Sequence, residues 1–130
     1  MTVRRAIGMI PAKDYERAKD WYADKLGVKP VEEMEDQGAY YEVGDSTFLL
    51  YPSEFAGTNK ANQIAFEVDD VDATVAELRS AGVEFMEFDM PELKTVDGVV
   101  TMEIGGRVLK SGFCTDSEDN VVVIGTAWRD

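Results

Sequence analysis

The sequence predicts an α+β fold in which a βαβββ pattern occurs twice within one domain. Two segments of similar composition, Asp14–Val28 and Asp69–Val83, each open with aspartate, carry apolar residues at helical spacing and end in Gly-Val. Each follows a segment of strand character and precedes at least three more. Repeats of this size pack around one shared core. We therefore expect a single domain over residues 1–130, with module one near 1–55 and module two near 61–130.

The first module contains the pattern of a strand, a helix and three further strands. Its first strand is expected at residues 4–12 (RRAIGMIPA), and its helix opens at the acidic cap Asp14 and ends at Gly27. Apolar alternation then predicts strands in VKPVEEME, AYYEVG and TFLLYP. Gly44 and Asp45 form a two-residue hairpin turn between the last two. The charged run VEEMED is typical of an edge strand, where charge prevents pairing with other molecules.

The second module repeats this order and extends it. NQIAFEV, residues 62–68, predicts its first strand, and a helix follows in which Val71 and Val75 share the apolar face. Further strands are expected in VEFMEF, VVTMEI, VLKSGFCT and VVVIGTA, with a two-residue turn at Gly105 and Gly106. EFAGTNKA is expected to connect the modules, and DMPELKTVDG to be an extra loop.

Charge and composition exclude several classes of partner. The chain carries 26 acidic and 13 basic side chains, a net charge of −13, which repels nucleic acid phosphates and anionic membrane surfaces. No apolar run approaches the roughly 20 residues that span a bilayer, and the N-terminal segment lacks the apolar core of a signal peptide. We therefore expect a cytoplasmic protein that binds neither nucleic acid nor a membrane.

Histidine is absent and cysteine occurs once. Without histidine, Ser-His-Asp and Cys-His catalysis are excluded, as is any metal site that requires an imidazole. The single cysteine, Cys114, cannot form an internal disulfide, and its place in the predicted strand SGFCTD favours a buried, inert thiol. Chemistry based on carboxylate, tyrosine or lysine remains, as does pure binding.

Three motifs resemble those of the vicinal oxygen chelate superfamily, which includes glyoxalase I, bleomycin resistance proteins and extradiol dioxygenases. AKDYERAKDWYADKLGVKP resembles its first helix, in which aspartate precedes an aromatic-Tyr pair and Leu-Gly. IAFEVDDVDATVAELRSAGVEF and TDSEDNVVVI resemble the start of its second helix and its final hairpin, although Ser117 replaces the family's proline and Asp119 its glycine. The resemblance implies two βαβββ modules whose sheets curl around a cup with the helices outside, often paired across a homodimer.

The same resemblance assigns the metal-ligand positions of the family's enzymes to this chain. They fall on Ile7 and Gln63, seven residues before Asp14 and Asp70, at or next to Leu49, and on Val123. Three aliphatic side chains and one neutral amide cannot hold a divalent cation, which needs several charged or imidazole ligands. We therefore expect no metal site and no other cofactor, and none of the metal-dependent activities of the family.

A cup with apolar walls and a few polar groups is typical of a small-molecule site. Strand alternation turns every second residue toward the cup. Trp128, near the C-terminus, is placed either as a lid over the cup or as a dimer contact. The expected ligand-binding residues are Arg5, Met9, Leu49, Tyr51, Gln63, Glu67 and Trp128.

Two functions of different kinds follow, and a third role stays open. The first is metal-independent sequestration of a small cationic or aromatic molecule, similar to that by bleomycin resistance proteins. The acidic charge and the aromatic residues Tyr41, Tyr51, Phe113 and Trp128 favour it. The second is a metal-free enzyme in which Glu67 is the general base. The third is a structural or regulatory homodimer whose cup is filled by its own side chains.

Overall fold

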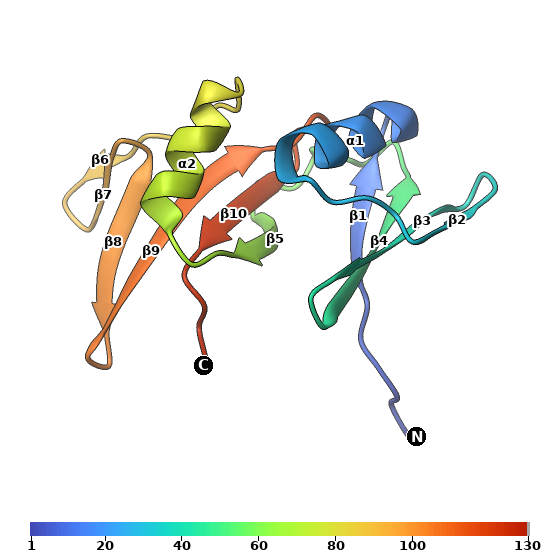
Figure 1. Ribbon diagram of the computed structural model, residues 1–130, viewed down its shortest axis with the longest axis horizontal. Helices are drawn as coiled ribbons and strands as arrows, with labels where there is room; N and C mark the ends of the chain where they lie inside the picture. Colours follow the sequence, from blue (N-terminus) through green and yellow to red (C-terminus); the bar gives the residue numbers. More distant parts are fainter. Residues whose placement is uncertain (130) are drawn as a thin grey trace. The chain divides into compact units, whose positions relative to one another are not determined.

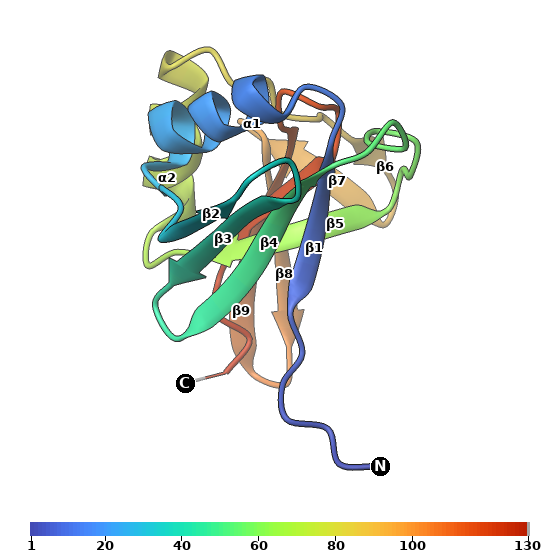
Figure 2. The ribbon, with the colours of Figure 1, turned by 90° about the vertical axis from the view of Figure 1, so that its right-hand side faces the viewer.

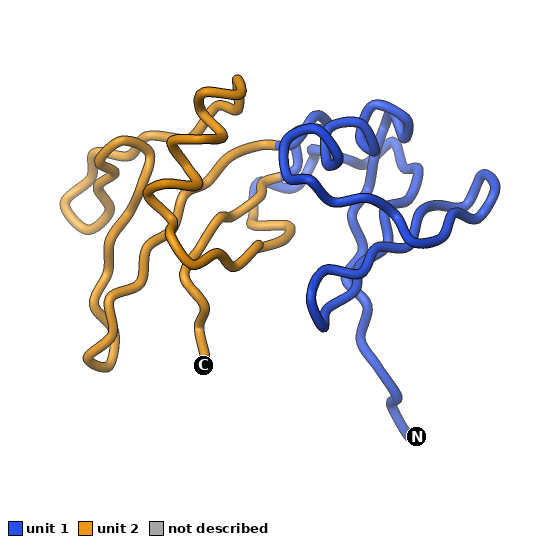
Figure 3. The backbone as a smooth tube through the Cα atoms, viewed as in Figure 1, with its two compact units in different colours: residues 1–60, 116–120 blue, residues 61–115, 121–130 orange. Residues whose placement is uncertain are grey.

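A computed structural model describes residues 1–129 of the chain, which form two compact units (Figure 3). Unit 1 comprises Met1–Lys60 with the turn Asp116–Asn120, and unit 2 comprises Ala61–Thr115 with the residues from Val121 onward. Each unit contains one sheet with parallel and antiparallel strands and one α-helix. The predicted α+β class is confirmed. No helix among these residues has both the length and the apolar character needed to cross a membrane.

Unit 1 contains the elements β1 (Gly8–Ala12), α1 (Tyr15–Trp21), a π-helical turn η1 (Tyr22–Leu26), β2 (Glu32–Met34), β3 (Gly38–Val43) and β4 (Ser46–Pro52). Its four strands follow the order β1-β4-β3-β2 (Figure 2). β1 runs parallel to β4, and β3 pairs antiparallel with β4 and β2. The predicted Gly44-Asp45 turn joins Val43 to Ser46. The exposed strand β2 lies at the sheet edge, which confirms the predicted charged edge.

Local sequence signals explain the helical segment of unit 1. Asp14 caps α1, because its carboxylate accepts a hydrogen bond from the backbone N–H of Arg17 at 3.1 Å. The segment ends at Gly27, whose φ of 69° is a left-handed conformation that glycine adopts without strain. Ala18 and Tyr22 are fully buried. This apolar side packs on β4, so the helical segment covers one face of the sheet.

Unit 2 contains β5 (Asn62–Glu67), α2 (Val71–Ser80), β6 (Asp89–Met90), β7 (Leu93–Val96), β8 (Val99–Ile104), β9 (Arg107–Thr115) and β10 (Val121–Gly125). Its strands follow the order β5-β10-β9-β8-β7-β6. β5 runs parallel to β10, and the other neighbours are antiparallel. The predicted turn at Gly105 and Gly106 joins Ile104 to Arg107.

α2 covers one face of the unit 2 sheet (Figure 1). Its cap is Asp70, whose carboxylate accepts a hydrogen bond from the backbone N–H of Ala73 at 3.0 Å. Val75 lies over Gly112 of β9, where a Cβ atom would come within 2.9 Å of a Val75 methyl group. The lack of a side chain at Gly112 therefore lets α2 approach the sheet. The strand register places Phe66 on the same face, as alternation predicted.

Two predicted strands are wrong, one in its extent and the other in its existence. β1 begins at Gly8, so Arg5 and Ile7 lie outside any strand. For Arg5 the parallel register gives the reason, because Gly8 pairs with Phe48 and Arg5 would therefore lie opposite the turn residue Asp45, before β4 begins. VEFMEF forms no strand either.

The predicted extra loop DMPELKTVDG is wrong as well, because it forms strands. β6 and β7 pair as a hairpin, and β7 continues through the Asp97-Gly98 turn into β8. From VEFMEF only Phe85 takes part in pairing, in an isolated bridge to Cys114. Cys114 itself is fully buried, as predicted.

Candidate functional site

Three of the expected ligand-binding residues lie side by side on one face of the unit 1 sheet. Met9 of β1 pairs with Leu49 of β4, and Tyr51 lies two residues further along β4. Met9 is exposed, and Leu49 and Tyr51 are half-buried. Leu50, which points to the other face, is fully buried. The three residues therefore occupy the face opposite α1.

Two other expected contributors lie elsewhere in unit 1. Arg5 precedes β1, and its guanidinium donates a hydrogen bond to the Tyr40 hydroxyl at 2.9 Å. Tyr41 was expected to favour an aromatic ligand, but it is fully buried and stacks on Phe48 with ring centroids 4.5 Å apart. The register places Tyr41 opposite Phe48 on the helix-covered face. The expectation for Tyr41 is wrong, because strand alternation turns its ring into the core.

In unit 2, Glu67 and Trp128 meet although they lie 61 positions apart in the sequence. The backbone N–H of Trp128 donates a hydrogen bond to Glu67 Oε2 at 3.1 Å. Arg107 holds the same segment, because its guanidinium donates to the backbone carbonyls of Ala127, at 2.8 Å, and of Trp128. Glu67 is exposed, and Trp128 is 70% exposed. An open carboxylate and an open aromatic residue are thus fixed at one place on unit 2.

The sheet beside Glu67 carries small side chains. The register places Gly125 of β10 opposite Glu67, and Ser111 of β9 opposite Gly125. This row lies on the face away from α2, because the adjacent residue Gly112 points at the helix. A glycine and a serine add little bulk next to the carboxylate. Strand parity could have identified Ser111 from the sequence, whereas nothing local links Arg107 to the C-terminal segment.

Gln63 is the extra residue of a β-bulge in β5. The consecutive residues Val121 and Val122 of β10 pair with Asn62 and Ile64, so Gln63 lies between the two pairs. A bulge interrupts the regular alternation of faces. Spacing alone therefore does not bring Gln63 to the face that carries Glu67.

A charged cluster on unit 1 joins α1 to β2. Lys19 Nζ lies 2.6 Å from Glu33 and 3.1 Å from Glu16, and the Tyr15 hydroxyl donates to Glu33 at 3.2 Å. Partial burial and the Glu33 carboxylate raise the pKa of Tyr15. The hydrogen bond from Lys19 holds the pKa of Glu33 below its ordinary value. Lys19 is shared between the two carboxylates, so the cluster fixes β2 against α1 and has no cation left over for an anionic ligand.

The donor set does not fit the divalent metal of the family's enzymes. The side chains of Ile7, Leu49 and Val123 carry no lone pairs, and Val123 is buried in β10. Of the four positions, Gln63 is the one with a side-chain oxygen, and a single ligand is too few for a hard or borderline cation. Within residues 1–129, no three side chains of histidine, cysteine, aspartate or glutamate lie close enough together to share a metal ion.

We expect Ni²⁺, Zn²⁺, Fe²⁺ and Mn²⁺ to leave the thermal unfolding midpoint at the value found with Mg²⁺. A ligand that does not bind the native state cannot shift unfolding. Scanning calorimetry with each metal measures the midpoint. A stabilisation by one metal that disappears in Gln63→Ala would contradict this prediction.

The sequence from residue 6 to residue 97 matches the Glyoxalase/Bleomycin resistance protein/Dioxygenase superfamily. Among solved structures, a glyoxalase/bleomycin resistance protein/dioxygenase from Alicyclobacillus acidocaldarius is 17% identical with a TM-score of 0.68, covering 94% of this chain and 89% of that one. Lactoylglutathione lyase from Agrobacterium tumefaciens is 18% identical with a TM-score of 0.67, covering 99% and 100%. The fosfomycin resistance protein FosX from Listeria monocytogenes is 11% identical with a TM-score of 0.70, covering 98% and 95%.

Identities this low carry the fold and no activity. Comparison with curated proteins gave no match. The superfamily match nevertheless spans most of the chain, and it agrees with the pair of strand-helix-strand units described above. The chain therefore belongs to the glyoxalase/bleomycin resistance protein/dioxygenase superfamily.

Proposed function

We propose that the protein binds a small planar aromatic cation at Glu67 and Trp128 of unit 2, without a metal ion. The observation that carries the proposal is the hydrogen bond from the Trp128 backbone to Glu67 Oε2. It holds an exposed carboxylate next to a residue with an exposed aromatic side chain. A carboxylate attracts a cation by charge, and an indole ring attracts it through its negative face.

The surroundings of this pair support binding of a flat molecule. Gly125 and Ser111 continue the row from Glu67 across the sheet and present little bulk. Arg107 uses its guanidinium on the carbonyls of Ala127 and Trp128, so the segment that carries the indole is held in place before a ligand arrives. A pre-ordered site loses less conformational entropy on binding.

The charge of the whole chain supports the same class of ligand. A net charge of −13 raises the local concentration of cations and disfavours anions. This effect is not specific to one site. A test must therefore separate the contribution of Glu67 from that of the overall charge.

We expect proflavine, a planar aromatic cation, to bind more tightly than the anion 8-anilinonaphthalene-1-sulfonate. Glu67→Gln keeps the shape of the side chain and removes its charge. The loss of a charge-assisted hydrogen bond should weaken proflavine binding by about 1–3 kcal/mol. Trp128→Ala should also weaken it, because the indole face is removed. Isothermal titration calorimetry at physiological ionic strength measures both changes.

Glu77→Gln is the matched control, because Glu77 is an exposed residue of α2 and its substitution changes the net charge equally. It should leave proflavine affinity unchanged. Equal weakening by Glu67→Gln and Glu77→Gln would mean that only the overall charge attracts the dye. If Glu67 were instead a general base, Glu67→Gln would abolish turnover of a substrate while leaving its affinity nearly intact.

A further inference from the structure

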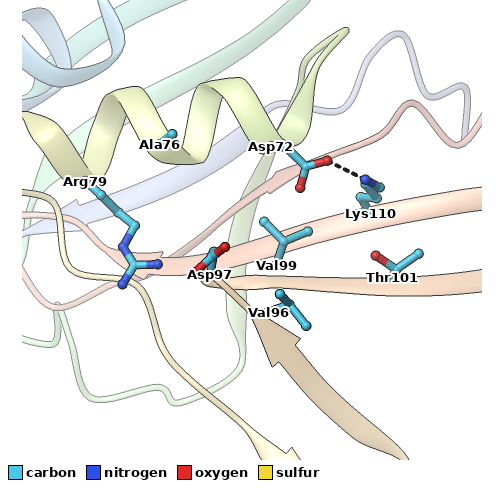
Figure 4. A pocket seen from close by; sticks show the side chains of 8 residues that line it. All are labelled: Asp72, Ala76, Arg79, Val96, Asp97, Val99, Thr101 and Lys110. Carbon is cyan, nitrogen blue, oxygen red and sulfur yellow. Dashed lines mark hydrogen bonds and ion pairs between the residues drawn. The ribbon is translucent and has the colours of Figure 1, made fainter.

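A pocket lies in unit 2 between α2 and the strands β7 to β9 (Figure 4). Its volume is about 590 Å³, within the range of roughly 300–1,000 Å³ that is typical of small-molecule sites. Asp72, Ala76 and Arg79 line it from α2, at the spacing of one helix face. The pocket lies on the helix-covered side of the sheet, because Val99, which also lines it, pairs with Gly112 under α2. It is therefore separate from the surface around Glu67.

The charged residues at one end of this pocket form an ion pair with each other, whereas those at the other end do not. At one end the Lys110 ammonium forms an ion pair with Asp72, so their charges compensate each other. At the other end are Arg79 and Asp97. The Asp97 carboxylate forms no hydrogen bond or ion pair with any group in residues 1–129. Arg79 has one charged partner in that range, Glu87, at 3.5 Å. This end thus offers a cation and an anion that are not paired with each other.

The backbone places these two charges at one corner. Asp97 and Gly98 have φ values of 52° and 81° and form the two-residue turn between β7 and β8. A Cβ atom on Gly98 would lie 3.2 Å from Nη1 of Arg79, so the guanidinium rests against the turn that carries Asp97. Figure 4 shows the Arg79 side chain extending from α2 toward Asp97.

The middle of the pocket is apolar. Val96 of β7 is 73% exposed, although it is a large aliphatic residue. Val99 forms the buried side, and Ala76 lies on the helix opposite (Figure 4). A ligand that covered Val96 would remove apolar surface from water, which is favourable. Beside the ion pair of Lys110 and Asp72, the pocket therefore combines the cation Arg79, the anion Asp97 and an aliphatic wall.

We propose that this pocket binds a free aliphatic α-amino acid as its zwitterion. The α-carboxylate binds the Arg79 guanidinium, the α-ammonium binds the Asp97 carboxylate, and the aliphatic side chain covers Val96 and Val99. A guanidinium presents paired N–H donors that match a carboxylate. A ligand with only one of the two charges would meet a like charge at this corner. A zwitterion has no net charge, so the acidic field of the protein does not repel it.

The test titrates ¹⁵N-labelled protein with L-leucine and follows the backbone amides by NMR. We expect saturable shifts confined to α2 and to the strands β7 to β9, with an affinity in the millimolar range. N-acetyl-L-leucine lacks the ammonium group, L-leucinamide lacks the carboxylate, and glycine lacks the side chain. Each should bind at least about tenfold more weakly than L-leucine, since each loses one of the three contacts.

Two variants test the roles of Arg79 and Asp97 in binding L-leucine. Arg79→Gln removes the cation, and Asp97→Asn removes the anion while keeping a residue that tolerates a positive φ in the turn. Each should weaken L-leucine at least about tenfold. Glu92→Gln, an exposed change outside this pocket, should leave the affinity unchanged. Absence of saturable shifts, or equally tight binding of N-acetyl-L-leucine or L-leucinamide to the unaltered protein, would overturn the proposal. The proflavine site lies on the other sheet face, so either proposal can fail without the other.

Discussion

Glu118→Gln should lower the free energy of unfolding by about 2–4 kcal/mol at pH 7. The Glu118 side chain has no exposed surface. It accepts hydrogen bonds from the backbone N–H of Asp14 at 2.7 Å, from Nε and Nη2 of Arg17 at 2.8 and 3.1 Å, and from the Ser117 hydroxyl at 2.8 Å. A glutamine would turn an amide N–H₂ toward some of these donors and leave buried polar groups unpaired. Urea denaturation followed by far-UV circular dichroism measures the change.

The pH dependence of this difference has a defined sign. Burial on its own raises the pKa of Glu118, but the hydrogen bonds from Arg17, Asp14 and Ser117 outweigh it, so the pKa lies below the ordinary 4.5. A depressed pKa in the folded state contributes stability above the unfolded-state pKa and loses it as the pH falls through the folded-state value. The difference in unfolding free energy between the wild type and Glu118→Gln should therefore stay constant near neutrality and become smaller below about pH 4.5.

Glu54→Gln is the matched control, since Glu54 is an exposed residue of the same unit. It should change stability by less than about 0.5 kcal/mol. Two results would mean that the charge of Glu118 does not stabilise the fold. The first is a difference in unfolding free energy between the wild type and Glu118→Gln that does not become smaller in acid. The second is a difference no larger than that caused by Glu54→Gln.

The elements that could be predicted are those with local causes. Asp14 was recognised as a helix cap because a carboxylate can accept a hydrogen bond from the first helical turn, and the structure contains that bond. The turns Gly44-Asp45 and Gly105-Gly106 lie between alternating strands and have the residue types that tight hairpins need. In these cases all the interacting groups lie within a few residues of one another, so the sequence pattern contains the physical cause.

The elements that could not be predicted depend on distant partners. VEFMEF has the composition of a strand, yet of its residues only Phe85 forms a β-bridge, to Cys114. Arg4 and Arg5 have no strand partner because the register would place them opposite the turn Gly44-Asp45. The Asp97-Gly98 turn could have been predicted, since Asp-Gly is a strong hairpin signal. That prediction would have indicated that the sheet continues into the expected loop.

The same distinction applies to the candidate sites. Glu67 was placed on a sheet face by the period of a strand, which is local information. Its contact with the Trp128 backbone depends on where the C-terminal segment is held by Arg107, and no sequence pattern records that. The pocket beside α2 combines Arg79 with Asp97, and only the fold brings these two residues to one corner.

The largest loss of stability is expected from Tyr22→Ala, at about 3–5 kcal/mol. Tyr22 is fully buried, and its ring lies 4.9 Å from that of Trp21 and 6.1 Å from that of Phe48. Its hydroxyl donates a hydrogen bond to Asp116 Oδ2 at 2.7 Å. Truncation removes both the aromatic packing and this bond. Urea denaturation of Tyr22→Ala and Tyr22→Phe measures the total and the hydroxyl contribution separately.

Tyr41 is the matched control for the hydroxyl. Its ring lies 6.5 Å from that of Tyr22 and is equally buried, which raises the pKa of Tyr41 to about 12. No protein group in residues 1–129 forms a hydrogen bond with its hydroxyl. Tyr22→Phe should therefore cost about 1–3 kcal/mol because it leaves a buried carboxylate oxygen with one donor fewer, whereas Tyr41→Phe should cost nothing or stabilise. If Tyr22→Phe and Tyr41→Phe lower the free energy of unfolding equally, the hydrogen bond to Asp116 adds no stability beyond that from burial of the ring. The turn Asp116–Asn120 is then held in unit 1 by its other contacts.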